Sequence, residues 1–226
     1  MDFNLAMVCV GGGRGERFGG DKLAELVGGR SIFQLSVAAL RRAFPDVPLV
    51  VVAPANRLEH WRRELGESFP GAHFVGGGAL RQDSVRAGVE VAAEAGAEVV
   101  AVHDAARPLV DPQDIKGVVW ALGDAAGAVL CGRVTDTVKR IDEDGLVRYT
   151  VDRGELRLAQ TPQVFRVAAL CRAWVEADQK TMWTDEAAML ESVGMPVRSV
   201  VAQRPNPKLT TEEDLVLIRA LSRSES

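Results

Sequence analysis

Short, continuous apolar runs recur along this chain and alternate with segments of helical periodicity. The runs cover Asn4–Val10, Leu49–Ala53, Glu98–Val102 and Ala126–Cys131. A continuous apolar run of this length is typical of a strand that is buried on both faces, as strands of parallel sheets are. The alternation of such strands with helices predicts an α/β fold: a Rossmann-like, mostly parallel sheet with helices on both faces.

The segments between the runs carry signals for helix starts and ends. Ser31 is the expected N-cap of a helix that extends to about Ala43. Thr184 and Gly194 are expected to cap and close a helix over 185–193, and Thr210 with Glu213 forms a capping box for the C-terminal helix. Helices are also expected over 57–65, 84–95, 112–122 and 167–178, and shorter strands over 72–75 and 197–202. No repeat or long linker divides the 226 residues, so we expect a single domain over 1–226.

The segment from about residue 133 to 163 departs from this pattern. It alternates weakly, contains many charged residues, and carries an Asp144-Gly145 pair between two stretches of strand-like sequence. A strand, an Asp-Gly turn and a second strand predict a β-hairpin. The segment is too polar to enter the core and too long to be a simple loop. We therefore expect a protruding arm that makes a homodimer contact, with a free flap as the alternative.

Composition excludes several functional classes. A net charge of −4 gives no general affinity for nucleic acid. The N-terminus lacks a signal-peptide pattern, and no apolar run reaches the length of a membrane span. Cys9, Cys131 and Cys171 lie far apart without metal-site spacing, and we interpret them as reduced core residues. These features predict a soluble, cytoplasmic protein with no membrane or nucleic-acid partner.

A glycine-rich segment follows the first strand, within VCVGGGRGERFGGDK (8–22). Glycines allow tight turns with exposed N–H groups, which form concave anion-binding sites. Arg14, Arg17 and Lys22 supply countercharge for phosphates. The segment fits neither the G-x-G-x-x-G dinucleotide pattern nor a P-loop, where Asp21 would occupy the lysine position. It therefore predicts a different polyphosphate-binding loop, with a purely structural surface turn as the alternative.

Two further polar segments are expected at the same edge of the sheet. They are the turn over 76–84 and the segment over 103–107, and ligands of such sheets bind at the carboxyl ends of the strands. Asp104 is the best candidate acid, although it could simply pair with Arg107. Ser84 could be a helix N-cap, a ligand hydroxyl or both. The edge is rich in cations but has no metalloprotease, CxxC or G-x-S-x-G motif, which favours phosphoryl or nucleotidyl transfer.

Seven segments together resemble the 2-C-methyl-D-erythritol 4-phosphate cytidylyltransferases of the non-mevalonate isoprenoid pathway. They are GGGRGERFGGDK (11–22), GGALRQDSV (77–85), VHDAARPLV (102–110), VTDTVKR (134–140), TVDR…TPQVF (150–165), TDEAAMLE (184–191) and NPKLTTEEDL (206–215). The resemblance covers nearly the whole chain, in order and with similar spacing. It implies transfer of CMP from CTP to the phosphate of methylerythritol phosphate, with release of pyrophosphate.

The resemblance also implies roles for residues. The implied catalytic residues are Arg17, Lys22, Arg153 and Lys208; the nucleotide-binding residues are Gly11, Gly12, Gly13, Gly15, Gly78, Arg81, Ser84 and Ala105; the acceptor-binding residues are Asp104, Arg107, Thr137, Thr161 and Thr184. No protein ligand for a metal is implied, and Mg²⁺ is expected mainly on the phosphates of CTP. The arm with Thr137 and Arg153 would cross into the other subunit of a homodimer.

The chain departs from the family pattern in the glycine segment. The family has Ala-Ala-Gly where Gly11, Gly12 and Gly13 stand, and proline where Asp21 stands, and the linker from Arg17 to Lys22 is short. An acid beside the lysine could alter how Lys22 reaches the phosphates. The alternatives in function are a cytidylyltransferase for another polyol phosphate such as ribitol 5-phosphate, a non-catalytic nucleotide-binding module, and a nicotinamide dehydrogenase, which the failed glycine pattern disfavours.

Overall fold

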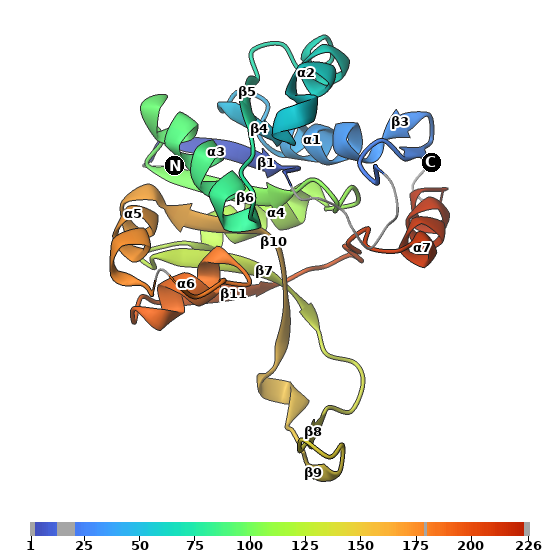
Figure 1. Cartoon of the computed structure of the whole chain (residues 1–226), viewed down its shortest axis with the longest axis vertical. Helices are drawn as coiled ribbons and strands as arrows, with labels where there is room; N and C mark the ends of the chain where they lie inside the picture. The colour runs from blue at the N-terminus through green and yellow to red at the C-terminus, as the bar shows by residue number, and fades with distance from the viewer. Residues whose placement is uncertain (1–2, 13–20, 179, 224–226) are drawn as a thin grey trace.

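The computed structural model describes residues 3–12, 21–178 and 180–223. Within them, seven strands form one sheet in the order β11-β7-β10-β6-β1-β4-β5 (Figure 1). Only the two pairs that contain β10 are antiparallel. The predicted mostly parallel sheet is therefore confirmed. Its strands are β1 (Leu5–Val10), β4 (Leu49–Ala53), β5 (His73–Gly76), β6 (Val99–Asp104), β7 (Gly127–Arg133), β10 (Arg157–Arg166) and β11 (Val197–Val201).

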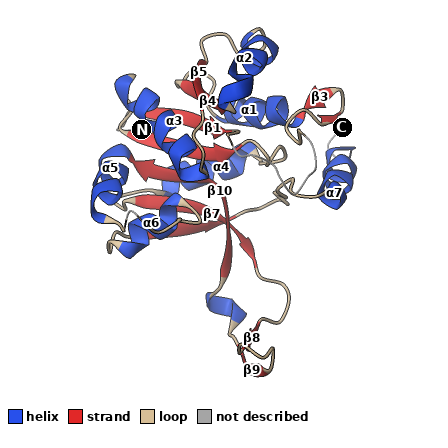
Figure 2. Ribbon diagram, viewed as in Figure 1, coloured by secondary structure: helices blue, strands red, loops and turns tan. Residues whose placement is uncertain are grey.

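Helices cover both faces of the sheet, as predicted (Figure 2). Side chains alternate along β1, so that Met7 faces one apolar core and Val8 the other. One core takes side chains from α1 (Ile32–Ala43), α2 (Leu58–Gly66), α4 (Pro112–Ala121) and α7 (Glu212–Arg223), and the other from α3 (Arg81–Glu94), α5 (Val167–Glu176) and α6 (Glu186–Ser192). Gly88 lets α3 lie close to the sheet, because a Cβ atom there would be 2.5 Å from Val8.

Helix caps confirm some sequence predictions and correct others. The Ser31 hydroxyl accepts a hydrogen bond from the Gln34 N–H at 3.2 Å and caps α1 as predicted. The prediction for α6 was wrong by one residue, because Asp185, not Thr184, is the N-cap. The predicted capping box of α7 is also displaced by one residue. Thr211 and Asp214 exchange its two hydrogen bonds, at 2.9 and 3.5 Å.

Strand β10 was not predicted, and it corrects the boundary of the arm. The sequence analysis placed residues up to 163 outside the core, but Thr161 and Gln163 are buried in β10 at the middle of the sheet. The Thr161 hydroxyl and the Gln163 amide N–H groups form hydrogen bonds there, such as that from Gln163 Nε2 to Asp185 at 2.8 Å, whereas Gln163 Oε1 has no partner among the described residues. The chain therefore returns from the arm to the sheet at Arg157, where β10 begins to pair with β7.

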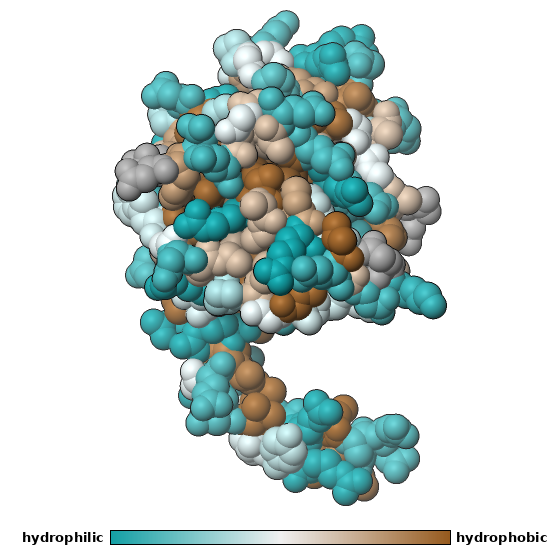
Figure 3. All heavy atoms as spheres, turned by 90° about the vertical axis from the view of Figure 1, so that its left-hand side faces the viewer, coloured by the Kyte–Doolittle hydropathy of each residue, from teal (hydrophilic) through white to brown (hydrophobic). Residues whose placement is uncertain are grey.

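The arm stands away from the body of the molecule (Figure 3). At its tip, β8 (Lys139–Ile141) and β9 (Val147–Thr150) form the predicted hairpin around the turn at Gly145, and a short 3-10 helix, η3 (Arg153–Glu155), leads back to β10. Large apolar side chains are 56–65% exposed along the arm and its return strand: Ile141, Leu146, Val147, Tyr149 and Leu158.

Several smaller features add to or correct the sequence predictions. A second, unpredicted hairpin joins β2 (Leu26–Val27) to β3 (Arg30–Ser31) through two glycines with positive φ, and another 3-10 helix, η2 (Ala55–Arg57), precedes α2. All three cysteines are free thiols, but Cys171 is exposed, which corrects its prediction as a core residue. No helix in the described part of the chain is long and apolar enough to span a membrane.

Candidate active site

The three polar segments predicted at one edge of the sheet do lie together there. Val10 ends β1 and lies beside Asp104, which ends β6. Gly11 and Gly77 follow β1 and β5, and their N–H groups donate hydrogen bonds to β4 at 2.7 and 2.8 Å. The described start of the glycine segment, Gly11 and Gly12, therefore lies with the 76–84 turn and the 103–107 segment at the carboxyl ends of the strands.

Asp104 is the centre of the charged cluster at this edge. Its Oδ1 accepts a hydrogen bond from Arg81 Nε at 3.2 Å, and its Oδ2 accepts one from Lys208 Nζ at 2.6 Å. Burial alone would raise the pKa of the carboxyl, but Arg81, Lys208 and Arg107 outweigh it and hold that pKa well below its usual range. Asp104 is thus a buried carboxylate paired with Arg81 and Lys208, and its predicted ion pair with Arg107 is not the one that forms.

Arg81 links Asp104 to a second buried acid, Glu186, that the sequence analysis did not single out. Both oxygens of Glu186 accept hydrogen bonds from Arg81 Nη1, at 3.0 and 2.7 Å. Burial would lower the pKa of Arg81, but the two carboxylates outweigh it and raise that pKa. Burial also raises the pKa of Glu186, and Arg81 opposes that rise. A contact between Arg81 and a nucleotide stays a prediction, because its guanidinium here bridges two carboxylates.

The segment that carries Lys208 is docked on the 103–107 segment. Arg107 Nη1 donates to the backbone oxygen of Asn206 at 2.7 Å, and the N–H of Leu209 donates to the residue before Arg107 at 2.8 Å. Lys22 Nζ donates to the backbone oxygen of Leu209 at 3.2 Å. Lys22 and Lys208, two predicted catalytic cations from distant parts of the chain, are thereby brought to the same edge as Asp104.

A buried histidine, His103, helps to fix the backbone of Asp104 through the hydroxyl of Thr161. The Thr161 hydroxyl accepts the N–H of Asp104 at 3.0 Å and lies 3.1 Å from His103 Nδ1, while His103 Nε2 lies 3.0 Å from the backbone oxygen of Arg107. The ring is satisfied in its neutral form, with Nε2 donating and Nδ1 accepting from Thr161. Burial lowers the pKa of His103 to about 4. The structure thus gives Thr161 a structural role, and its predicted contact with the acceptor stays a prediction.

The folded protein is expected to lose stability as the pH falls from about 6.5 to 4, because only the unfolded chain then takes up a proton on His103. The unfolded state binds more protons in this window, so the free energy of unfolding rises with pH. Its loss between about pH 6.5 and 5 should be about 2 kcal/mol. Urea unfolding at both pH values would measure it. His103→Gln should reduce the slope, and the exposed His73→Gln should not; an unchanged slope in His103→Gln would contradict the assignment.

Ser84 lies beside the glycine turns, within a helix and not at its N-cap. It sits inside the first turn of α3, so its prediction as an N-cap was wrong. Its Oγ accepts the Gly78 N–H and donates to the Leu80 oxygen, both at 3.1 Å. A Cβ atom on Gly12 would collide with this Oγ. Ser84 therefore holds the 76–84 turn against the glycine segment, and a direct contact with a ligand stays a prediction.

The remaining predicted residues lie in three places. Ala105 is fully buried, and Thr184 is exposed just before α6. Thr137 and Arg153 are exposed in the arm, which extends away from the sheet (Figure 1), and Arg153 donates a hydrogen bond to the Thr135 backbone. Gly13, Gly15 and Arg17, together with Arg14, lie outside the described residues.

The sequence of the chain matches a known family. Residues 5–224 match the family described as IspD, 2-C-methyl-D-erythritol 4-phosphate cytidylyltransferase. The chain belongs to this cytidylyltransferase family. The resemblance of the seven sequence segments is thereby confirmed.

Relatives in the cytidylyltransferase family include single and bifunctional proteins. A 2-C-methyl-D-erythritol 4-phosphate cytidylyltransferase from Symbiobacterium thermophilum is 37% identical, and the match covers 98% of this chain and 94% of that relative. A bifunctional enzyme IspD/IspF from Rhodospirillum rubrum is 42% identical, with 98% of this chain and 58% of the relative covered. The chain therefore spans little more than half the length of the bifunctional relatives that it matches.

Solved structures of the same family share the fold. The 2-C-methyl-D-erythritol 4-phosphate cytidylyltransferase of Thermus thermophilus is 31% identical and superimposes with a TM-score of 0.74, covering 99% of this chain and 100% of that one. A 4-diphosphocytidyl-2C-methyl-D-erythritol synthase is 28% identical, with a TM-score of 0.81 over 98% of this chain and 99% of that one. Because these two matches cover nearly all of this chain, they include its arm.

Proposed function

We propose that this chain transfers CMP from CTP to 2-C-methyl-D-erythritol 4-phosphate, giving 4-diphosphocytidyl-2-C-methyl-D-erythritol and pyrophosphate. The observation that carries the proposal is the cluster of Asp104, Arg81 and Lys208 beside Lys22, in a chain that belongs to the cytidylyltransferase family. An oxygen of the acceptor phosphate attacks the α-phosphorus of CTP. The bond from that phosphorus to the oxygen of the β-phosphate breaks, and pyrophosphate leaves with the bonding electrons.

The chain contributes mainly charge and position to this reaction. Lys22, with Arg17, would stabilise the negative charge that accumulates around the attacked phosphorus. The backbone of the glycine segment over 11–15 would bind the triphosphate, and the 76–84 turn the cytidine. Lys208 would hold the attacking phosphate, fixed in place by its 2.6 Å contact with Asp104. Arg107, whose guanidinium is anchored by its hydrogen bond to the Asn206 backbone oxygen at 2.7 Å, would bind the acceptor beside Lys208.

Magnesium fits this site as an ion bound through the phosphates. The described residues contain no group of three or more His, Cys, Asp or Glu side chains that could hold a metal ion, and both oxygens of Asp104 already accept hydrogen bonds from cations. The phosphates of CTP would therefore supply most of its ligands. When bound, the ion would neutralise phosphate charge and help pyrophosphate to leave. Lys22 and Lys208 would supply the remaining positive charge from the chain.

We also propose that the arm completes the site of a second subunit in a homodimer. Thr137 and Arg153 lie on the arm, far along it from the charged cluster of their own chain. The exposed apolar side chains of the arm, such as Leu146 and Tyr149, are the kind that a partner covers. In this dimer Arg153 would bind the acceptor phosphate in the partner's site.

Mixing Arg153→Ala with Lys208→Ala is expected to restore activity that neither variant has alone. A mixed dimer has one site in which the core and the donated arm are both intact. Random reassociation of equal amounts should give about a quarter of wild-type activity, because half the dimers are mixed and each has one working site. Pyrophosphate release after co-refolding would measure it. Activity no greater than the sum of the separate variants would show that Arg153 does not act across subunits.

The reaction itself is tested by incubating the protein with CTP, Mg²⁺ and one acceptor at a time. We expect pyrophosphate release with 2-C-methyl-D-erythritol 4-phosphate, and a cytidine diphosphate product that carries the polyol. Faster turnover of ribitol 5-phosphate would replace the proposed acceptor with another polyol phosphate. Binding of CTP without turnover of either acceptor would instead favour a non-catalytic nucleotide-binding module.

A cytoplasmic location is also proposed. Cys9, Cys131 and Cys171 are all free thiols, one of them exposed. Free thiols are typical of reducing compartments, in which CTP is also available. Fractionation of cells that express the protein would test this location.

A further inference from the structure

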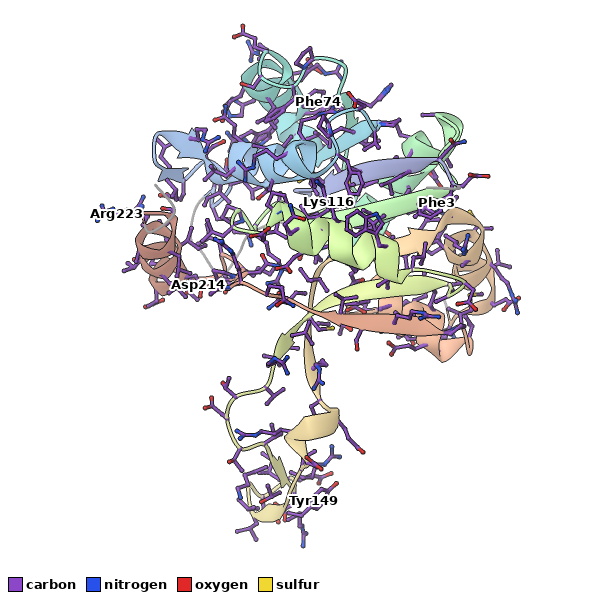
Figure 4. The ribbon with its side chains drawn as sticks, turned by 180° about the vertical axis from the view of Figure 1, so that it is seen from behind. Phe3, Phe74, Lys116, Tyr149, Asp214 and Arg223 are labelled. Carbon is purple, nitrogen blue, oxygen red and sulfur yellow. The ribbon has the colours of Figure 1, made fainter. Side chains whose placement is uncertain are left out.

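A basic groove lies beside the candidate active site and is not used by the proposed reaction. It has a volume of about 710 Å³, within the usual range for small-molecule sites. Its walls are the β2–β3 hairpin, α1 from Leu35 to Arg42, the loop over 108–112 and the end of α7. Figure 4, in which Arg223 is labelled, shows this end of α7 beneath the hairpin.

The groove is lined by a concentration of positive charge. Five arginines line it (Arg30, Arg42, Arg204, Arg219 and Arg223), and Asp111 is the only acid among its lining residues. The whole chain, by contrast, has a net charge of −4. A local excess of one charge in a concave site raises the concentration of oppositely charged ligands there. The groove is therefore suited to an anion.

Two of these arginines are available to a ligand. Arg204 pairs with Asp111 at 3.0 Å, and Arg219 donates to the Leu26 backbone at 3.1 Å. The side chains of Arg30 and Arg42, both exposed, make no ion pair or hydrogen bond within the described residues. Guanidinium groups bind phosphate oxygens in pairs of parallel hydrogen bonds, so two of them suit a ligand with more than one phosphate charge.

The lining between the arginines is apolar. Leu26 is 56% exposed and Leu109 is half-buried, whereas Val27, Leu35 and Val110, which also line the groove, belong to the buried core. A purely ionic ligand would leave the surface of Leu26 and Leu109 unused, whereas a short hydrocarbon group would cover it. We propose that the groove is a binding site for a small organic diphosphate, whose phosphates bind Arg30 and Arg42 and whose apolar group contacts Leu26 and Leu109.

A ligand in the groove would be coupled to the active site, because the walls of the groove continue from the segments that carry its cations. The β2–β3 hairpin follows Lys22, the 108–112 loop follows Arg107, and α7 follows Lys208. Arg219 joins α7 to the hairpin, and Leu209 joins Lys22 to the Arg107 segment. A ligand that clamps these walls would change the affinity for CTP, and CTP would change the affinity of the ligand by the same factor.

Calorimetric titration with butyl diphosphate separates this groove from the active site. The titration uses the Lys22→Ala variant, in which the phosphate site at the glycine segment is weakened. Butyl diphosphate should still bind the Lys22→Ala variant. Its affinity should fall at least about tenfold when Arg30→Gln and Arg42→Gln are added to that variant, since two charge-assisted contacts are lost. The matched control adds Arg63→Gln and Arg172→Gln, which remove the same charge on exposed helix surfaces outside the groove and should leave the affinity unchanged.

Three results would overturn the proposal. One is unchanged affinity in the Arg30→Gln/Arg42→Gln variant. Another is loss of all binding in Lys22→Ala alone, which would place the ligand in the active site. The third is equal affinity for inorganic pyrophosphate, which would remove the argument for an apolar group. None of these readouts depends on turnover, so the result stands apart from the proposed reaction.

Discussion

Asp104→Ala is expected to lower kcat/KM for the acceptor by about 1,000-fold or more. The carboxylate holds Lys208 at 2.6 Å and Arg81 at 3.2 Å. Without it, the two cations repel each other, and Lys208 loses the contact that, in the proposed reaction, would aim it at the attacking phosphate. Loss of one positioned charge in such a site typically costs about 100- to 1,000-fold, and here the positions of two cations depend on one anion. Steady-state rates of pyrophosphate release at saturating CTP would measure the effect.

The same substitution should also lower the free energy of unfolding, by about 2 kcal/mol. Removing one partner of a fully buried ion pair costs more, but Lys208 is 35% exposed and water replaces part of the lost interaction. Asp114→Ala is the matched control. Asp114 is also buried, and its carboxylate accepts the Gln203 N–H at 3.0 Å away from the charged cluster. It should lose stability but keep kcat/KM within about threefold. Equal losses of kcat/KM in both variants would mean that Asp104 acts only through stability.

Most of the sheet could be predicted from the sequence because its central parallel strands are continuous apolar runs. The runs that contain β1 and β4 match the observed strands within one residue. Strand β10 was missed because its buried half contains Thr161 and Gln163, whose hydroxyl and amide N–H groups form hydrogen bonds that only the tertiary structure provides. A strand whose polar residues are paired in this way has no apolar run to identify it.

The candidate site, too, could be predicted only in part from local sequence, because the rest of it depends on tertiary contacts. Glycines and cations at strand ends could be recognised locally, so the position of Asp104 was predictable. Its partners were not, because Arg81 and Lys208 are 23 and 104 residues away in the sequence. Glu186 has a helical context of small residues and gives no signal of its own; only burial against Arg81 distinguishes it. Local sequence thus identifies the candidate groups, and packing decides which of them pair.

The acid beside Lys22, Asp21, departs from the proline of the family pattern, and the structure gives it a partner other than Lys22. Asp21 forms an ion pair with Arg57 of η2, and its Oδ1 accepts the Leu23 N–H at 3.2 Å. Lys22 Nζ meanwhile donates to the Leu209 backbone. Asp21 therefore anchors the end of the glycine segment to the body of the protein and does not neutralise Lys22.

Lys22→Ala is accordingly expected to lower kcat by about 100- to 1,000-fold, because in the proposed reaction one cation that would face the attacked phosphate is lost while the fold is kept. Lys22 lies outside both apolar cores, so circular dichroism should be unchanged. Asp21→Asn is the matched control: it removes the neighbouring charge but keeps an oxygen for the Leu23 N–H, and kcat should stay within about threefold of wild type. A loss in Asp21→Asn as large as that in Lys22→Ala would mean that the carboxylate, and not only the lysine, acts on the phosphates. An unfolded Lys22→Ala variant would count against its place in the site, since a side chain that acts only on substrate is not needed for folding.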